Sequence, residues 1–286
     1  MAGASSETLR VGFIGLGNQG GPIVRHIIKG GFPTTLWARR PEVLGPFEAL
    51  GAATASSAAE LAAATDLVGI CTWDDASVVD VMRGDQGVLA GARPGTIVAV
   101  HATVHPDLCI ELAAEAAAKD VVVIDAPVSG GPDRSEAGTL LVMIGGEDTV
   151  AERCRPVFET FGRPVLHLGA VGAGQLAKLV NNTLFTANVE LATGAIEVGA
   201  RMGIDPAQLI EVITNGSASS YGAQTVRFRL NNPSTDSRTR AYLAKDVSLL
   251  VDAAHSVGAD PTSLLVDVAR AGVERLGRAH PGPPAE

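Results

Sequence analysis

Short runs of apolar residues alternate with helical patterns through the first half of the chain. The runs have the length and composition of strands buried on both faces of a sheet. The expected strands are residues 11–14, 34–37, 66–72, 96–100, 121–125, 140–144 and 165–168. The expected helices are residues 21–29, 41–50, 75–83, 106–119 and 150–161. This alternation predicts an α/β domain whose doubly wound, mostly parallel sheet carries helices on both faces.

The pattern changes after Gly169. From Gln175 to about Met202, apolar residues recur at helical spacing on one face, which predicts a single helix roughly 40 Å long at ~1.5 Å per residue. Further helix starts are expected at residues 205–206 and 260–261, where an aspartate precedes a proline. We therefore expect a dinucleotide-type domain over residues 1–169. A long interdomain helix and an all-α substrate and oligomerisation domain would follow over residues 170–286, with a disordered tail from residue 281.

Composition narrows the class of protein. The chain has 286 residues, 46% of them hydrophobic, and a net charge of -9. This acidity argues against nucleic acid or an anionic membrane as the main partner. Cys71, Cys109 and Cys154 lack metal-ligand or redox spacing, so we expect reduced thiols and no metal site. The polar start and the lack of a long apolar run lead us to expect a soluble, cytoplasmic protein.

A glycine-rich loop follows the first expected strand. Its residues are Gly15, Leu16, Gly17, Asn18, Gln19 and Gly20. A strand that leads into G-x-G-x-x-G and then a helix directs backbone N–H groups at a pyrophosphate. Gly15 allows the tight turn, Gly17 lets the phosphate approach, and Gly20 lets helix and strand pack closely. We therefore expect a Rossmann-type dinucleotide site; the alternative is a structural turn.

The end of the second strand indicates which dinucleotide binds. A carboxylate at this place would bind a ribose 2′-hydroxyl and favour NAD. This chain has Arg39 and Arg40 instead, and guanidinium groups suit a 2′-phosphate. We expect NADP to be preferred, with NAD possible; the alternative is that the two arginines lie in a solvated turn.

Four separated segments together resemble the β-hydroxyacid dehydrogenase family. They are Gly12-Phe-Ile-Gly-Leu-Gly17 with Gly20, Asp125-Ala-Pro-Val-Ser-Gly-Gly131, Gly172-Ala-Gly-Gln-Leu-Ala-Lys-Leu-Val-Asn-Asn182, and Lys245-Asp246. That family includes 3-hydroxyisobutyrate dehydrogenase and tartronate semialdehyde reductase and is related to 6-phosphogluconate dehydrogenase. The resemblance spans nearly the whole chain and implies reversible oxidation of a small β-hydroxyacid.

The resemblance also implies roles for single residues. Ser129, Gly130 and Gly131 would bind the substrate carboxylate; the alternative is an ordinary turn after a strand. Thr103 would lie near the nicotinamide ribose, and Thr72 and Trp73 near the adenosine. Lys245 would bind a phosphate or ribose of the cofactor, with a plain surface lysine as the alternative, and Asp246 is expected to be structural.

Lys178 and Asn182 carry the expected chemistry. They are four residues apart on the long helix, so their side chains leave the same face. A lysine in a cleft between domains can donate a proton to a carbonyl oxygen as hydride arrives at the carbon, and can take the proton back in reverse. Asn182 can hold the substrate without charge. The alternative for Lys178 is an exposed lysine on an amphipathic helix.

Some positions depart from the family pattern. Tyr221 stands where relatives have a tryptophan that lines the substrate pocket. Arg134 could reach an anionic substrate or lie in solvent, and His101 could shape the nicotinamide pocket or be structural.

Two other functions remain open. An imine reductase-like enzyme would usually replace the lysine that is Lys178 here, and a non-catalytic dinucleotide-binding scaffold would not need Lys178 and Asn182. The long apolar helix also leads us to expect a homodimer or homotetramer.

Overall fold

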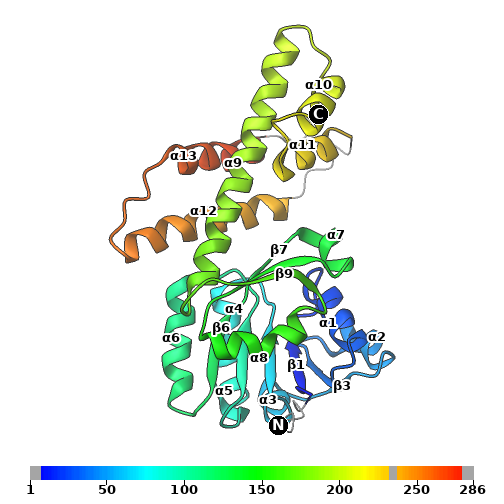
Figure 1. Ribbon diagram of the computed structural model, residues 1–286, viewed down its shortest axis with the longest axis vertical. Coiled ribbons are helices and arrows are strands. Elements are labelled where there is room, and N and C mark those ends of the chain that lie inside the picture. Colours follow the sequence, from blue (N-terminus) through cyan, green and yellow to red (C-terminus); the bar gives the residue numbers. More distant parts are fainter. Residues whose placement is uncertain (1–7, 232–236, 279–286) are drawn as a thin grey trace, which may run out of the picture. The chain divides into compact units, whose positions relative to one another are not determined.

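The computed structural model describes residues 8–231 and 237–278 and divides the chain into two compact units, Met1–Lys178 and Leu179–Glu286 (Figure 1). The expected disordered tail from residue 281 lies outside the described residues. Each unit is described separately below.

The first unit is built on a six-stranded parallel sheet with the order β3-β2-β1-β4-β5-β6. Its strands are β1 (Val11–Ile14), β2 (Thr34–Trp37), β3 (Ala53–Thr54), β4 (Leu67–Ile70), β5 (Ile97–Val100) and β6 (Val122–Asp125). The order reverses direction between β1 and β4. Such a switch point leaves a crevice outside the carboxyl ends of the strands, where dinucleotides bind in doubly wound folds. The expected doubly wound sheet is confirmed.

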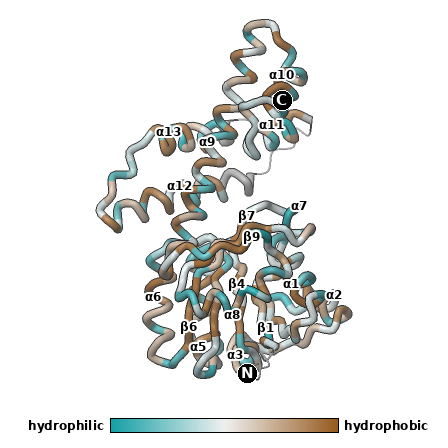
Figure 2. The backbone as a smooth tube through the Cα atoms, viewed as in Figure 1, coloured by the Kyte–Doolittle hydropathy of each residue, from teal (hydrophilic) through white to brown (hydrophobic). Residues whose placement is uncertain are grey.

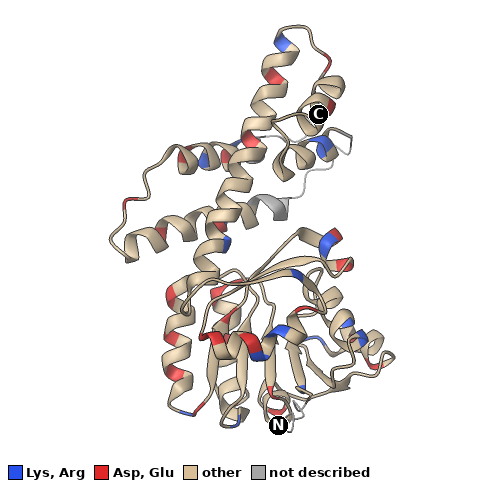
Figure 3. Ribbon diagram, viewed as in Figure 1, with Lys and Arg blue, Asp and Glu red and all other residues tan. Residues whose placement is uncertain are grey.

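Helices cover both faces of this sheet. They are α1 (Gly20–Lys29), α2 (Gly45–Glu48), α3 (Ala58–Ala64), α4 (Asp75–Met82), α5 (Val88–Gly91), α6 (Pro106–Ala117) and α8 (Asp148–Phe158). One buried cluster joins the sheet to α1 and α8, and a second joins it to α3, α4 and α6. The strands are largely apolar in Figure 2 and almost free of charge in Figure 3, because both of their faces are buried.

A second sheet, which the sequence pattern does not predict, completes this unit. It contains β7 (Val128–Ser129), β8 (Leu140–Ile144) and β9 (Gly162–His167). The expected strands at 140–144 and 165–168 therefore leave the large sheet and form a smaller one. A single bridge between Asp125 and Gly145 connects the ends of β6 and β8.

Two expected helices begin or run differently. The expected helix over residues 41–50 is a short 3₁₀ helix (Pro41–Val43) followed by α2, because Pro46 lacks an N–H group and starts a new helix. The last helix, α13 (Leu264–Arg278), begins after residues 260–261. Ser263 precedes it, and its hydroxyl accepts the backbone N–H of Val266 at 3.3 Å.

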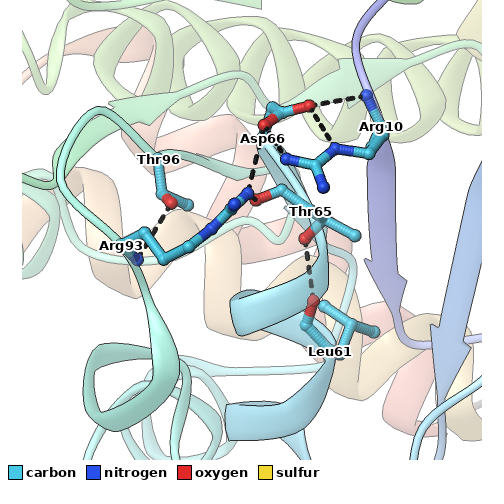
Figure 4. Close-up of polar contacts among 6 residues, drawn as sticks. All are labelled: Arg10, Leu61, Thr65, Asp66, Arg93 and Thr96. Carbon is cyan, nitrogen blue, oxygen red and sulfur yellow. Dashed lines mark hydrogen bonds and ion pairs between the residues drawn. The ribbon is translucent and has the colours of Figure 1, made fainter.

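A polar cluster ties together the amino ends of the central strands (Figure 4). Asp66, just before β4, accepts the backbone N–H of Arg10 at 3.0 Å and its guanidinium at 2.9 and 2.6 Å. Arg93 reaches the same carboxylate at 3.2 Å, and its backbone N–H donates to Thr96. These arginines lower the pKa of Asp66 to about 2. The cluster occupies the edge of the sheet opposite the glycine loop.

The second unit is helical in its described residues. The long helix α9 (Ala173–Arg201) begins in the first unit and continues into the second, which also holds α10 (Pro206–Asn215), α11 (Tyr221–Asn231), α12 (Ser237–Ser256) and α13. Gly222 and Gly272 bring α11 and α13 close to α9, since a Cβ at either glycine would lie within 3.0 Å of α9 atoms. Arg275 of α13 binds the carboxylate of Glu190 at 2.7 Å. Among the described helices none has the length and apolar character needed to cross a membrane.

Candidate active site

The loops that carry most of the candidate residues leave the larger sheet at one edge. Ile14 pairs with Trp37 and Ile70, Ile70 with Val100, and Val100 with Asp125, so the five parallel strands end in register. The glycine loop, the arginine turn after β2 and the loops after β4, β5 and β6 therefore emerge side by side.

The glycine loop has the conformation that its residues predict. Gly15 has φ +99°, and a Cβ there would lie 2.1 Å from the carbonyl oxygen of Cys71. A Cβ on Gly20, the first residue of α1, would lie 1.8 Å from the carbonyl oxygen of Gly15. Gly17 has open space around the place of a Cβ, with no described atom within 4 Å. The loop thus combines two sterically required glycines with an open position where a phosphate can approach the helix N-terminus.

Two other predicted cofactor residues in this region have buried polar atoms without a hydrogen-bond partner in the described part of the chain. They are Nε2 of Gln19, which precedes α1, and Oγ1 of Thr72, which follows β4. Thr103, in the loop after β5, is buried, whereas Trp73 is half exposed. Unsatisfied buried polar atoms are uncommon in folded proteins. Gln19 belongs to the glycine loop, and Thr72 follows Cys71, whose carbonyl oxygen lies beside Gly15, so both atoms fit a site for a polar ligand such as a dinucleotide.

Arg39 and Arg40 lie just beyond the end of β2, next to the strand that leads into the glycine loop. Both side chains are exposed, and no ion pair to either is found within the described residues. Their positions are compatible with binding a phosphate group at the edge of the site.

The substrate loop begins in the short strand β7. Ser129 pairs with Leu141, Gly130 has φ +141°, and Gly131 starts the short helix α7 (Gly131–Glu136). A Cβ on Gly130 would lie 2.8 Å from the Cβ of Arg134, which packs across this turn. The Arg134 guanidinium donates to the carbonyl oxygen of Arg163 at 3.3 Å.

Lys178 is the last residue of the first unit. It lies on α9 with only 4% of its surface exposed. The alternative, an exposed lysine on an amphipathic helix, is therefore wrong. A lysine is seldom buried unless its environment provides a polar partner.

Asn182 follows one turn later on α9 and lies in the second unit. Its Nδ2 donates to the carboxylate of Asp246 at 2.6 Å and to the hydroxyl of Tyr242 at 3.4 Å. Lys245 lies 3.4 Å from the other Asp246 oxygen and 5.6 Å from the centre of the Tyr242 ring. The structure thus brings Asn182 and Lys245 together around a fully buried carboxylate, consistent with the structural role expected for Asp246.

Tyr221 is the first residue of α11. It is about half exposed, and its ring lies 5.8 Å from that of Phe185 on α9.

His101 is enclosed in an aromatic core. Its ring stacks on Phe13 at 5.8 Å and meets the edges of Phe158 and Phe161. Nδ1 donates to the carbonyl oxygen of Ala126 at 2.8 Å. Burial lowers the pKa of His101 to about 4, so the ring is neutral at physiological pH. These contacts agree with the structural alternative for this residue.

Two buried polar residues near the site were not singled out from the sequence. Asp125 ends β6, and its carboxylate accepts backbone N–H groups at the start of α9, while Gln175 bonds to the loop that contains Thr103. The available signal for Asp125 was a carboxylate at the end of an otherwise apolar strand, which requires polar partners when buried.

Comparisons with known proteins agree with this architecture. The family described as the NAD binding domain of 6-phosphogluconate dehydrogenase matches residues 10–169, and the one described as NAD-binding of NADP-dependent 3-hydroxyisobutyrate dehydrogenase matches residues 172–280. Mouse mitochondrial 3-hydroxyisobutyrate dehydrogenase is 32% identical, over 86% of this chain and 76% of its own length. The 2-(hydroxymethyl)glutarate dehydrogenase of Eubacterium barkeri is 31% identical, over 86% of this chain and 83% of its own.

A solved structure shares both units. The Mycobacterium tuberculosis 3-hydroxyisobutyrate dehydrogenase, determined with L-serine, matches with a TM-score of 0.83 and 28% identity, over 95% of this chain and 94% of its own. The fold, the glycine loop and these relatives define an NAD(P)-binding oxidoreductase. Within that class, the chain belongs to the β-hydroxyacid dehydrogenase family.

Proposed function

We propose that this protein interconverts a small β-hydroxyacid and its semialdehyde, with NADP preferred and Lys178 as general acid and base. The observation that carries the proposal is the placement of Lys178. It is buried on α9, and the first turn of that helix is bonded to the carboxyl end of β6 and to the loop after β5. A buried lysine is thereby tied to the same sheet edge as the glycine loop.

In this proposal Lys178 supplies and takes up the one proton that such a reaction needs. A bound nicotinamide supplies hydride in reduction and accepts it in oxidation. In reduction, the Lys178 ammonium donates a proton to the carbonyl oxygen of the substrate; in oxidation, the neutral amine takes the hydroxyl proton. Asn182, which Asp246 holds by its amide nitrogen, would bind the substrate.

We assign the substrate carboxylate to Ser129, Gly130 and Gly131. A hydroxyl and the N–H groups of two glycines form an uncrowded site for an anion. The relatives act, by their names, on acids with a hydroxymethyl group or the equivalent 3-hydroxyl, which fits this class of substrate. Tyr221, in the proposed substrate and oligomerisation domain 170–286, would contact the rest of the substrate.

Replacement of Lys178 tests the proposed chemistry. With a panel of β-hydroxyacids and both NADP and NAD, Lys178→Ala should lower kcat by about a hundredfold or more, because general acid–base catalysis contributes that much. Lys29→Ala, at an exposed position on α1, is the matched control and should keep normal turnover. Near-normal turnover by Lys178→Ala would refute the assignment.

Glycine substitutions test the cofactor site. Gly17→Ala should fold normally, since its Cβ meets open space, yet bind NADPH at least tenfold more weakly. Gly20→Ala should instead destabilise the unit, because its Cβ would collide with the backbone. Equal NADPH affinity in Gly17→Ala and wild type would exclude a pyrophosphate at this position.

We assign the choice between NADP and NAD to Arg39, assisted by Arg40. Other parts of the cofactor would be contacted by Thr72, Trp73, Thr103 and Lys245. Arg39→Ala should weaken NADPH binding about tenfold or more, since a charge-assisted hydrogen bond contributes about 1.5–3 kcal/mol. NADH binding should be unchanged and serves as the internal control. A wild-type preference for NADH would overturn this part of the proposal.

The two alternative functions have distinct signatures. Reduction of cyclic imines, with no oxidation of hydroxyacids, would indicate an imine reductase. Cofactor binding without turnover of the whole panel would indicate a scaffold. The presence of Lys178 and Asn182 favours the dehydrogenase.

We also expect self-association through α9. Leu184, Leu191 and Val198 recur every seven residues and are each about half exposed, forming an apolar stripe on this helix. We expect α9 of a second copy to pack against this stripe, which would give a homodimer or homotetramer.

A further inference from the structure

The residue before the long helix α9 is Gly172, which has no side chain that could cap the helix. The helix begins with Ala173, Gly174 and Gln175, and the first N–H groups of any helix have no partner within the helix. Asp125 supplies the missing acceptors from the end of β6. Its Oδ1 accepts the N–H of Gly172 at 2.6 Å, and its Oδ2 accepts the N–H of Gln175 at 2.8 Å. A carboxylate also complements the positive end of the helix dipole.

The glycines around Asp125 make room for this cap. A Cβ on Gly174 would lie 2.3 Å from the carbonyl oxygen of Met143 and 2.8 Å from Oδ2 of Asp125. A Cβ on Gly145 would lie 2.3 Å from the other oxygen, Oδ1. The carboxylate is therefore enclosed by backbone on two sides, which leaves it and the helix start little freedom to move.

Gln175 extends the same connection to the loop after β5. Its side chain is fully buried, and its Nε2 donates to the carbonyl oxygen of Ala102 at 2.8 Å. Its Oε1 accepts the N–H of Val104 at 3.2 Å. The two bonds hold the residues on either side of Thr103, and they need both the donor and the acceptor of an amide.

We propose that Asp125 and Gln175 are positioning residues: together they hold Lys178 and Thr103 in a fixed relation. This inference rests on the proposed role of Lys178 as general acid and base. Lys178 follows Gln175 by three residues, so a shift of the first turn of α9 displaces the amine. A displacement of about 1 Å in a reacting group can cost about a hundredfold in rate.

The first experiment measures Asp125→Asn in the full-length protein. An amide can accept at one oxygen only and presents its NH₂ to the other N–H donor, so one capping bond is lost. Hydrogen–deuterium exchange should accelerate across residues 172–178. Turnover per NADPH-binding site should fall about tenfold or more, while the dissociation constant for NADPH stays within about threefold, because the glycine loop is untouched.

Asp66→Asn is the matched control. Asp66 also accepts a backbone N–H and directly precedes β4, at the opposite edge of the same sheet. The control should lower the unfolding temperature but leave both exchange at residues 172–178 and turnover per binding site unchanged. A loss of turnover in Asp66→Asn equal to that in Asp125→Asn would show a general effect of stability and overturn the proposal.

Gln175→Met separates the loop contacts from the cap and provides a second variant if Asp125→Asn does not fold. It keeps the backbone bond to Asp125 and should accelerate exchange in residues 101–105 and lower turnover per binding site. For either variant, unchanged hydrogen–deuterium exchange would overturn the proposal for the residue that was replaced. Faster exchange with full turnover would overturn it as well. The proposed function fails separately, when wild type turns over no hydroxyacid or Lys178→Ala remains active.

Discussion

His101 and Asp125 should make opposite contributions to the pH dependence of folding. Both are buried, and His101 bonds to the carbonyl oxygen of Ala126, the residue after Asp125. Burial lowers the pKa of His101 from 6.5 to about 4, because the charged imidazolium would lose its hydration inside the aromatic core. Burial raises the pKa of Asp125 from 3.8 to about 6, because desolvation outweighs its hydrogen bonds from N–H groups.

The sign of each contribution follows from which state binds the proton. Between pH 4 and 6.5 the imidazole is protonated in the unfolded chain but not in the native one, so His101 lowers stability as the pH falls. Between pH 3.8 and 6 the Asp125 carboxyl is protonated in the native state but not in the unfolded one, so it raises stability as the pH falls. A difference of one bound proton changes the free energy of unfolding by about 1.4 kcal/mol per pH unit, so each residue changes it by about 2 kcal/mol between pH 6 and 4.5. The two contributions nearly cancel.

Removing the histidine should expose the contribution of Asp125. His101→Asn keeps an N–H donor and does not titrate. From pH 6 to 4.5, its free energy of unfolding should rise by about 2 kcal/mol relative to that of wild type. The cost of the lost ring contacts is an offset that does not depend on pH. The Cys109 thiol near Asp125 does not titrate in this range, because burial raises its pKa well above 9.0.

Urea unfolding followed by tryptophan fluorescence provides the assay. The two tryptophans of the chain, Trp37 and Trp73, both belong to the first unit, so their emission reports on the part that contains His101 and Asp125. Series at half-unit pH steps for wild type and His101→Asn give the difference directly. Parallel curves, separated by a constant offset, would refute the assignment of an unprotonated buried His101.

Three further perturbations have defined outcomes. Gly174→Ala should destabilise the first unit by several kcal/mol, because its Cβ would meet a carbonyl oxygen at 2.3 Å. Gly194→Ala, on the same helix but with open space around the Cβ, should raise stability by about 0.5–1 kcal/mol, and thermal unfolding compares the two variants. Asp66→Asn should lower the free energy of unfolding by about 1 kcal/mol at pH 7, and this difference from wild type should vanish as the pH falls from 3.8 through 2, where the native carboxyl is protonated. Urea titrations measure it, and a difference that persists at low pH would contradict the expectation. Leu184→Glu with Leu191→Glu should reduce the mass measured by light scattering to that of one chain, and an unchanged mass would place self-association elsewhere.

The periodicity of the sequence was sufficient for the parallel sheet and the long helix. Both depend on local spacing: strands buried on two faces are continuous apolar runs, and α9 repeats its apolar face over many turns. The pattern did not predict the second sheet, because β7 has two residues and β8 is as apolar as the strands of the large sheet. Sheet membership depends on pairing between distant segments, which local spacing does not encode.

The candidate site was predicted best where a motif has a steric requirement. Gly15 and Gly20 occupy positions where any side chain would collide with the backbone, so their spacing is informative. The sequence does not predict the contact made by Asp125, because the family resemblance assigns a role only to Ser129, Gly130 and Gly131 of its segment. Asp125 faces the start of α9 instead, a contact across 47 residues of sequence. Only the three-dimensional structure connects the two segments.

Asp125 is also the only charged residue within the described strands of the larger sheet. An apolar residue at the end of β6 would avoid the cost of desolvation but leave the N–H groups of Gly172 and Gln175 buried without acceptors. A serine or threonine within α9 could cap the helix, but it would not attach the helix to the sheet. A carboxylate on the strand does both, at the edge from which the glycine loop and the Thr103 loop emerge. Burying the Asp125 carboxylate costs desolvation energy. Its function in the fold is best explained by the need to fix the start of the helix that carries Lys178.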